Sequence, residues 1–361
     1  MPVEIADFPA QIRKGQEKAI NALIDHYAEH DRGTLWMCCG SGKTVATAIY
    51  IELRNEDLTV IFTPFIHLAK QWRDDYLKWL PTTKAKFMCV CSEKDSVQEI
   101  GPLLAGQLFN ALGKTPTEEF DELVKEAEKS RGKKHGETRV STDPEEIAKF
   151  LKQKGRKVVI STYASADVYG EAQRLASVHA NFGVGDEAQW TATGDKDTES
   201  TKMLHNAHIK IDKRLFTTAT VRHYTRDDLV YSMDNELAYG PHVLVDEQGN
   251  PDPWTLRQAI DNKEAPPYRI VFSFVTDPSF NSELMQLPPY RDIAVDVGQQ
   301  NDPAEIMRFI GQAMAIERAK AKYGVKKPLN FFSNVSRARL FTDVLNACKR
   351  YPETFSKSLS K

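Results

Sequence analysis

Short runs of consecutive apolar residues alternate along this chain with longer stretches in which apolar residues recur at helical spacing. The short runs predict strands buried on both faces, and the helical spacing predicts amphipathic helices. In the first part of the chain the expected strands are 33–37, 58–63, 86–91, 158–162, 182–186 and 214–218. The expected helices are 11–29, 44–54, 66–79, one that opens at 143, and 164–180. This alternation predicts an α/β fold, a parallel sheet flanked by helices.

A second block with the same alternation begins after residue 268. Its expected strands are 269–275, 292–297 and 329–333, and its expected helices are 303–322 and 335–350. A stretch rich in Pro, Gly and polar residues at 246–253 separates the two blocks and indicates a loop or linker. We therefore expect an N-terminal α/β domain over 1–245, a linker over 246–267, and a partial second α/β domain over 268–361.

One segment of the first domain departs from the alternation. Residues 92–142 are rich in Glu, Lys, Asp and Gly and contain a basic cluster at 129–135. Such a cluster fits either a contact with nucleic acid or a solvated insertion on the surface. We favour the insertion.

Composition narrows the class of protein only slightly. The 48 basic and 50 acidic residues nearly cancel, so the overall charge neither supports nor excludes a nucleic-acid partner. The five cysteines show no spacing typical of metal ligands, which favours a reduced compartment without disulfides. No signal segment and no apolar run of membrane-spanning length occurs, so we expect a cytoplasmic protein without a membrane partner.

The clearest chemical signal is the loop between the first strand and the second helix, Met-Cys-Cys-Gly-Ser-Gly-Lys-Thr at 37–44. Glycines let the backbone pass close to bound phosphate, Lys43 reaches the terminal phosphates, and the Thr44 hydroxyl can hold Mg²⁺ at the start of a helix. Met37 stands where the usual pattern has its first glycine, and a simple glycine turn before a helix is the alternative. The loop residues expected to bind nucleotide are Gly40, Ser41, Gly42, Lys43 and Thr44.

A second signal follows the fifth expected strand, where the sequence reads Asp186-Glu187-Ala188-Gln189. A nucleotide site needs carboxylates to fix Mg²⁺ and to orient the attacking water. We assign Asp186 to the metal and Glu187 to the water. An Asp-Glu pair is common on any protein surface, but this one follows a phosphate loop and precedes Thr218-Ala219-Thr220, and that order strengthens the assignment.

The order of these motifs resembles that of the superfamily 2 helicases and translocases, the DEAD/DEAH-like ATPases built from two RecA-like domains. Members of this superfamily often lack the first glycine of the loop, so Met37 fits. The closer likeness is to large predicted helicases and to motor subunits of type I and type ISP restriction enzymes. The elements that carry the resemblance are Arg13 with Gln16, 40–44, 63–72, 161–165, 186–189, 218–222 and 330–339.

The resemblance implies a RecA-like fold of the P-loop NTPase class, followed by an incomplete second RecA-like unit. It implies that Arg13 and Gln16 read adenine, that ATP and Mg²⁺ are cofactors, and that Lys43, Asp186, Glu187 and Gln189 are catalytic. Thr218, Ala219 and Thr220 would couple hydrolysis to movement. The residues expected to contact nucleic acid are Thr63, Pro64, Thr162, Ser165 and Asn334.

The function implied is ATP hydrolysis that drives translocation on nucleic acid or its unwinding, with DNA favoured over RNA, in a restriction or phage-defence system. Contacts to phosphate through backbone amides and hydroxyls would allow an almost neutral protein to bind. Taken singly, the Thr and Ser residues fit strand-end capping equally well. Trp72 and Trp190 likewise fit either core packing or stacking on bases.

The sequence departs from the family pattern in two ways. Gln189 stands where this group usually has His, and because Gln both donates and accepts hydrogen bonds we expect its coupling to Thr218 and Thr220 to survive. No Gln-x-x-Gly-Arg-x-x-Arg-like element follows 330–339, so we expect truncation before motifs V and VI, with a missing C-terminal half or a protein partner supplying them. The alternative is a largely non-catalytic, nucleotide-responsive module that binds nucleic acid or protein.

Overall fold

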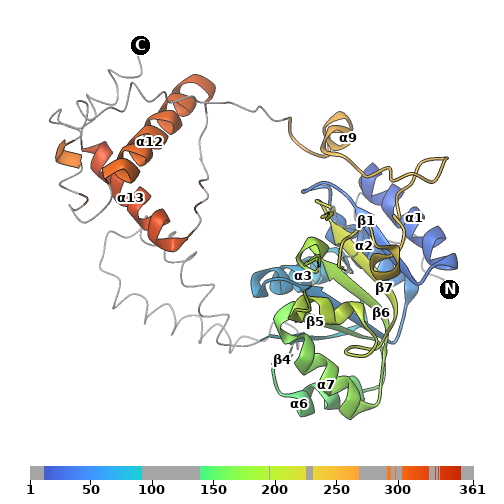
Figure 1. The fold of residues 1–361 in the computed structure, drawn as a ribbon. Coiled ribbons are helices and arrows are strands. Elements are labelled where there is room, and N and C mark those ends of the chain that lie inside the picture. Colours follow the sequence, from blue (N-terminus) through green and yellow to red (C-terminus); the bar gives the residue numbers. More distant parts are fainter. Residues whose placement is uncertain are drawn as a thin grey trace. The chain divides into compact units, whose positions relative to one another are not determined.

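The structure is a computed structural model of the 361-residue chain. It describes residues 12–91, 139–194, 196–224, 231–267, 291–293, 297, 303–324, 330, 332 and 334–350. The chain divides into two compact units, Met1–Pro267 and Tyr268–Lys361, which are treated separately below (Figure 1).

A seven-stranded sheet forms the centre of the first unit, in the order β1-β7-β6-β2-β5-β3-β4. Its strands are β1 (Arg32–Trp36), β2 (Leu58–Thr63), β3 (Lys86–Val90), β4 (Arg139–Ser141), β5 (Lys157–Thr162), β6 (Ala180–Asp186) and β7 (Ile211–Thr218). All six pairings between neighbouring strands are parallel. The expected parallel α/β fold is therefore confirmed, with small shifts at the strand ends.

Strand β4 was not expected, because it lies at the end of the polar segment 92–142. It pairs with β3 through Met88↔Arg139 and Val90↔Ser141 and forms one edge of the sheet. Its central residue, Val140, is 48% exposed, so the strand lacks the buried apolar run by which the other strands were predicted. The predicted insertion therefore ends before residue 139, and 92–138, including the basic cluster, lie outside the described residues.

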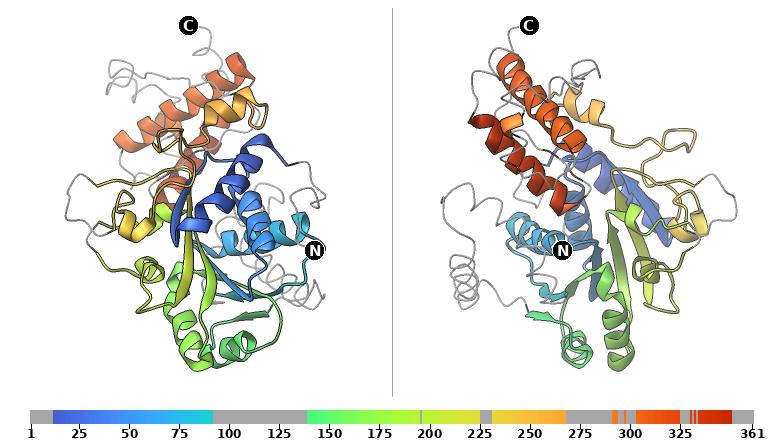
Figure 2. Two further views of the ribbon diagram at one scale, coloured as in Figure 1. Left: turned by 90° about the vertical axis from the view of Figure 1, so that its right-hand side faces the viewer. Right: turned by 60° about the vertical axis from the view of Figure 1, so that its left-hand side comes forward.

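Helices cover both faces of the sheet (Figure 2). Helices α1 (Lys14–Glu29), α2 (Lys43–Arg54) and α3 (Ile66–Trp79) share one hydrophobic cluster, and α6 (Pro144–Leu151) and α7 (Ala166–Ala176) share another. The strands divide their side chains between the two clusters, as β2 does with Ile61 in the first and Val60 and Phe62 in the second. Burial on both faces explains why the strands read as continuous apolar runs.

Helix α7 is shorter than the expected 164–180. Ser177 follows it with φ 55°, in the left-handed region, and its backbone N–H closes the last turn on Arg174. The chain then enters β6 at Ala180. A non-glycine C-cap leaves little trace in the sequence, which accounts for the error.

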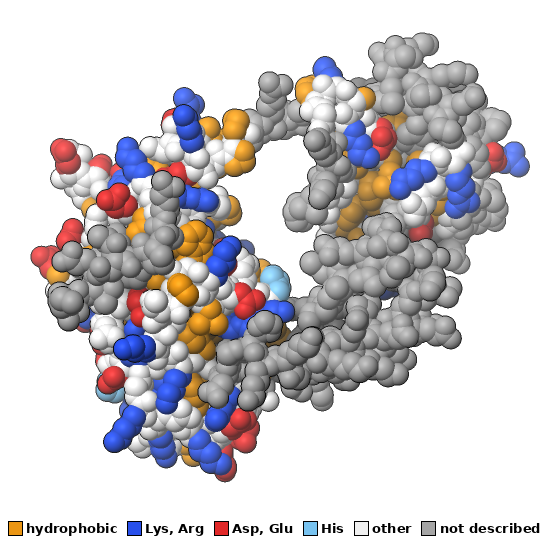
Figure 3. Space-filling model, turned by 180° about the vertical axis from the view of Figure 1, so that it is seen from behind, with side chains coloured by type: hydrophobic (Ala, Val, Ile, Leu, Met, Phe, Trp, Pro, Cys, Tyr) orange, Lys and Arg blue, Asp and Glu red, His pale blue; other side chains and the backbone are white. Residues whose placement is uncertain are grey.

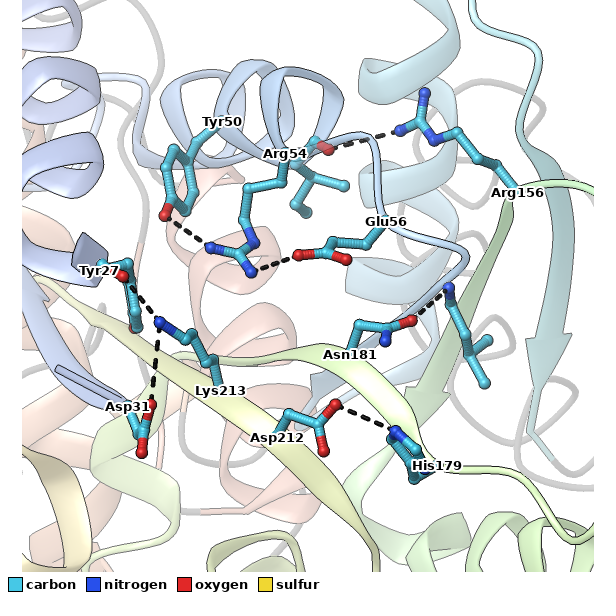
Figure 4. A network of polar contacts seen from close by, with 12 residues as sticks. Tyr27, Asp31, Tyr50, Arg54, Glu56, Arg156, His179, Asn181, Asp212 and Lys213 are labelled. Carbon is cyan, nitrogen blue, oxygen red and sulfur yellow. Dashed lines mark hydrogen bonds and ion pairs between the residues drawn. The ribbon is translucent and has the colours of Figure 1, made fainter. Parts of the chain in front are cut away.

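Polar contacts hold the ends of several elements together on the side of the sheet shown in Figure 4. The Arg54 guanidinium donates to the Tyr50 hydroxyl at 3.2 Å (Figure 4). It also lies over the Phe182 ring, 5.0 Å from the ring centroid. The Asn181 side chain accepts from the backbone N–H of Leu58 at 3.1 Å. These contacts brace the amino ends of β2 and β6, and they leave the carboxyl ends of the strands at the opposite edge of the sheet.

Residues 246–267, expected as a linker, instead pack against the first unit. Trp254 is 4% exposed and forms a parallel bridge with Met37, and its carbonyl accepts from the Cys38 N–H at 2.8 Å. Short helices α8 (Glu236–Tyr239) and α9 (Leu256–Asp261) flank this contact in the sequence. One buried tryptophan thus anchors a segment whose composition resembles a linker.

The second unit contains the two expected helices, α12 (Pro303–Tyr323) and α13 (Val335–Lys349), which share a buried cluster. The expected strand 292–297 is wrong at its described residues, since Ile293 and Val297 are helical and Ile293 is fully buried in that cluster. Of the expected strand 329–333, Asn330 and Phe332 are described and neither is in a strand. The expected strand 269–275 lies outside the described residues.

The apolar segments of the second unit are thus not all strands, because an apolar run of this length also fits a buried helix. Among the helices that the structure describes, none is both long and apolar enough to span a lipid bilayer.

The Arg214 side chain, 2% exposed, ties β7 to the loop that precedes it. Its guanidinium donates to four neutral acceptors at 2.6–3.1 Å, the carbonyls of Met203, Ile209 and Ile211 and the side chain of Asn206. Burial lowers the pKa of this guanidinium to about 9. These bonds satisfy three otherwise buried carbonyls and make Arg214 a structural residue.

Replacing Arg214 with Met is therefore expected to lower the free energy of unfolding by about 3 kcal/mol, since it leaves buried acceptors unsatisfied. Chemical denaturation followed by circular dichroism measures the change. Arg257→Met is the matched control, because that side chain is 85% exposed and pairs with Asp261 on its own helix. Equal stability of the two variants would contradict this role.

Candidate nucleotide site

Three parallel strands bring the chemical motifs of the sequence to one edge of the sheet. Strand β7 lies between β1 and β6, with Trp36 opposite Thr218 and Asp186 opposite Thr217. The N–H of Met37 donates to the carbonyl of Thr218 at 3.1 Å. Because all three strands end at the same edge, the loop after β1 and the segment after β6 meet across the end of β7.

The loop 37–44 has the backbone of a phosphate cradle. Gly40 and Gly42 have φ values of 76° and 85°, in the left-handed region that favours glycine. The Ser41 hydroxyl donates to the Cys38 carbonyl at 2.7 Å and holds the loop closed. Helix α2 begins at Lys43, so its first N–H groups have no acceptor within the helix and lie at the loop.

Met37 needs no glycine-like backbone. It continues the line of β1, pairs with Thr218 and Trp254, and is fully buried. An extended residue with a buried apolar side chain is what this position requires. The missing first glycine is thus accounted for by the strand, which runs one residue further than its assigned end.

Arg13 and Gln16, which the resemblance assigned to adenine, lie against the phosphate loop. The Arg13 guanidinium donates to the carbonyl of Gly40 at 3.0 Å. The Gln16 side chain accepts from the N–H of Arg13 at 2.9 Å, and its amide lies 3.5 Å from the carbonyl of Gly42. The start of α1 is therefore fixed to the same loop that would hold phosphates.

A residue that the sequence reasoning missed supports this end of α1. The Glu264 carboxylate accepts from the N–H of Gly15 at 2.9 Å and from the Trp254 indole at 3.0 Å. Gly15 has no room for a side chain, since a Cβ there would lie 2.4 Å from the Trp254 indole nitrogen. Glu264 is 249 residues away from Gly15 in the chain, and no local pattern marks it.

Asp186 is buried and held at both carboxylate oxygens. Thr217 donates its hydroxyl to Oδ1 at 2.7 Å, and the Trp72 indole donates to Oδ2 at 2.7 Å. Burial raises the pKa of Asp186, while these two hydrogen bonds and the nearby Lys43 charge lower it. The sequence reasoning missed Thr217 and left Trp72 undecided between core packing and stacking on bases. The structure shows that Trp72 is buried in α3, four residues before the buried Tyr76.

The donor set around Asp186 fits a magnesium ion. Mg²⁺ prefers oxygen ligands, commonly one or two from the protein, with substrate phosphates and water completing its octahedron. The Asp186 carboxylate and the Thr44 hydroxyl, in the first turn of α2, are such oxygens. Lys43 is 8% exposed, and its ammonium lies 3.5 Å from the Cys38 carbonyl at the same loop.

Glu187, Gln189 and Thr218 form a chain of hydrogen bonds beside Asp186. The Thr218 hydroxyl donates to the Gln189 side chain at 2.6 Å, and Gln189 donates to the Glu187 carboxylate at 2.8 Å. The Thr220 N–H donates to the Thr218 hydroxyl at 3.0 Å. The glutamine that replaces the usual histidine therefore makes the link expected of it.

The backbone at Glu187 departs from ordinary strand or helix geometry. Its φ of 50° and ψ of 52° lie in the left-handed region, which is uncommon for a residue with a side chain. Holding Glu there costs about 1 kcal/mol.

Ala219 is the middle residue of the expected coupling motif. Its backbone carbonyl accepts from the Trp36 indole at 3.1 Å, which joins the end of β7 to β1.

The hydroxyls expected to contact nucleic acid are buried and bonded within the protein. Thr63 and Thr162 are paired at the ends of β2 and β5. Thr63 donates to the carbonyl of Phe65, and Thr162 donates to the Ser165 hydroxyl, both at 3.1 Å. These bonds fit strand-end capping, which was the alternative interpretation, and the neighbouring Pro64 is partly exposed.

The other residues considered for contact with nucleic acid are Asn334, Trp190 and Trp72, of which the first two lie at the surface and the third in the core. Asn334 lies in the second unit, where its side chain accepts from the Arg337 N–H at 2.9 Å and caps α13. Trp190 follows Gln189 and is 50% exposed, with its ring edge-on to Phe65 at 5.1 Å between centroids. Trp72, by contrast, is 2% exposed.

Gly42→Ala is expected to abolish nucleotide binding. A Cβ on Gly42 would lie 2.1 Å from the Gln16 amide nitrogen, in addition to the strain of a side chain at positive φ. Gly155→Ala is the control for strain alone, because Gly155 has φ 90° but nothing within 4 Å of the added carbon. Binding of a fluorescent ATP analogue separates the two, and unchanged affinity of Gly42→Ala would show that the loop rearranges.

Comparison with solved structures supports the fold. The chain aligns with the ATP-dependent type ISP restriction-modification enzyme LlaBIII bound to DNA at a TM-score of 0.59 and 20% identity, covering 94% of this chain and 22% of that one. It also aligns with a nuclease-deletion mutant of the type ISP enzyme LlaGI in complex with a DNA substrate mimic, at a TM-score of 0.49 and 24% identity, covering 70% and 18%. The chain thus spans about a fifth of the length of these enzymes.

No curated protein matches the chain. The family model described as "Type III restriction enzyme, res subunit" matches residues 10–223, which include α1, the phosphate loop, Asp186 and the whole of β7. This match covers more than half of the 361 residues. The chain therefore belongs to the family of type III restriction enzyme res subunits.

Proposed function

We propose that this chain is the ATP-binding motor core of a restriction-type enzyme, in which ATP hydrolysis stimulated by DNA drives translocation. The observation that carries the proposal is the meeting of the phosphate loop and Asp186-Glu187-Ala188-Gln189 at one sheet edge, with Thr218 bonded to Gln189 between them. Membership of the res-subunit family supports ATP as substrate.

In this proposal the loop binds the triphosphate of ATP. The left-handed turns at Gly40 and Gly42 let backbone N–H groups face the β- and γ-phosphates, and the free N–H groups of α2 add to them. Lys43 neutralises charge on the terminal phosphates. Arg13 and Gln16 contact the base, since both already lie against the loop.

Thr44 and Asp186 would hold Mg²⁺, which when bound neutralises charge on the phosphates as the terminal bond breaks. Glu187 orients the water that attacks the γ-phosphate. Gln189 holds the Glu187 carboxylate at 2.8 Å and is itself held by Thr218. A displacement of the end of β7 would therefore reach the residue that orients water, which gives Thr218, Ala219 and Thr220 their coupling role.

DNA is the nucleic acid we favour, because the solved relative of similar fold is bound to DNA. The net charge of −2 supplies no general attraction to a polyanion, and charges of both signs are interspersed over the face of the first unit seen in Figure 3. Contacts would then come from local backbone N–H groups near Pro64 and the ends of β2 and β5, because the hydroxyls there are already engaged.

Lys43→Ala is expected to reduce DNA-stimulated ATP hydrolysis by about 10²-fold or more, because it removes a charge placed on the transferring phosphoryl group. Phosphate release with and without duplex DNA measures the loss of hydrolysis.

Glu187→Gln is expected to retain ATP binding and lose turnover. Equilibrium binding of ATP measures the first property, and phosphate release measures the second.

Lys86→Ala is the matched control for Lys43→Ala. Lys86 is the first residue of β3 and so lies at the amino ends of the strands, away from the phosphate loop at their carboxyl ends. Among its described contacts, its ammonium bonds only Gln153 and the Lys154 carbonyl. Hydrolysis rates that are identical with and without DNA, and that Lys43→Ala does not change, would contradict the motor proposal. ATP binding without turnover would instead favour a nucleotide-responsive binding module.

A further inference from the structure

The indole of Trp72 makes the closest contact between α3 and the candidate metal carboxylate. Trp72 lies in the middle of α3 and is 2% exposed, and its Nε1–H donates to Asp186 Oδ2 at 2.7 Å. Thr217 donates to the other oxygen at 2.7 Å, and the Tyr163 hydroxyl donates to the Asp186 backbone carbonyl at 2.9 Å. Three donors from three different elements therefore converge on one residue.

Two donors on opposite oxygens restrict the orientation of the carboxylate. The terminal torsion of an aspartate is broad, so an unbound carboxylate rotates easily. A bond to each oxygen fixes the plane, while each oxygen keeps a second lone pair with which to accept from a metal ion or its water. Outer partners of this kind orient ligating carboxylates and influence metal affinity in known metal sites.

Core packing alone does not account for a tryptophan at this position. A Phe would fill the apolar space of Trp72 and would not require a buried acceptor. The indole N–H needs a partner once it is buried, and the partner it has is the Asp186 carboxylate.

We propose that Trp72 is a positioning residue that, together with Thr217, sets the Asp186 carboxylate for Mg²⁺, a role that rests on the nucleotide site proposed above. Trp72 acts through Asp186 and touches neither nucleotide nor metal. Its loss lowers the affinity of the site for Mg²⁺ and leaves the loop's own affinity for ATP in place.

The test is Trp72→Phe in the full chain, which removes the N–H and keeps an aromatic ring. A fluorescent ATP analogue is titrated first in EDTA and then at increasing Mg²⁺. Affinity in EDTA should match the wild type, and the Mg²⁺ concentration that half-saturates the effect should rise by about tenfold or more. Trp79→Phe is the matched control on the same helix; its half-buried ring lies beneath the Lys78 ammonium, and neither quantity should change.

Thr217→Val, which removes the donor to the other oxygen with almost no change of shape, should reproduce the effect of Trp72→Phe and keeps the test decisive if the tryptophan variant does not fold. Wild-type Mg²⁺ dependence in both variants would overturn the role, as would an equal loss of affinity in EDTA, which marks general damage to the fold. A wild-type chain that binds no nucleotide would overturn the proposed function and this role with it.

Discussion

The parallel pairing of β7 with both β1 and β6 is the constraint on which the site depends. It places the ends of three strands side by side, so that a loop near residue 40 and a turn near residue 187 become neighbours although they are far apart in sequence. Hydrogen bonds across the strand ends continue this pairing, from Met37 to Thr218 and from Thr217 to Asp186. Without β7 between them, the phosphate loop and the acidic segment would have no common support.

Buried polar groups, each with defined partners, complete that support. Asp186 is held by an indole and a hydroxyl, and Arg214 in the same sheet is held by carbonyls and an amide. Burial disfavours the charged form of both groups, so it raises the pKa of Asp186 and lowers the pKa of Arg214. The two groups serve different ends, because Arg214 anchors the start of β7 whereas Asp186 lies at the carboxyl-end edge where chemistry is expected.

Contacts from several elements converge on the phosphate loop and on the acidic segment beside it. Arg13 and Gln16 reach the loop from α1. Trp72 reaches Asp186 from α3, and Gln189 is bonded to Thr218 at the end of β7. The res-subunit family match covers this region of the chain, and its fold is shared with a type ISP enzyme.

Strands and helices of the first unit followed from local pattern, because a parallel sheet buried on both faces leaves continuous apolar runs, and the loop and acidic motifs were evident from residue type and order. Edge strand β4 was not predicted because two of its three residues, Arg139 and Val140, are exposed. The segment around Trp254 was taken for a linker because composition does not reveal one buried anchor. In the second unit, short apolar runs did not distinguish strand from helix at Ile293.

The sequence by itself determined the fold class, the phosphate loop and the order of the chemical motifs, since each depends on neighbouring residues. Tertiary structure alone decided that Trp72 and Thr217 hold Asp186, that Glu264 supports Gly15, and that Thr63 and Thr162 face inward. The physical reason is that hydrogen-bond partners distant in the chain are chosen by the packing of whole elements, which leaves no periodic or local signature in the residues themselves.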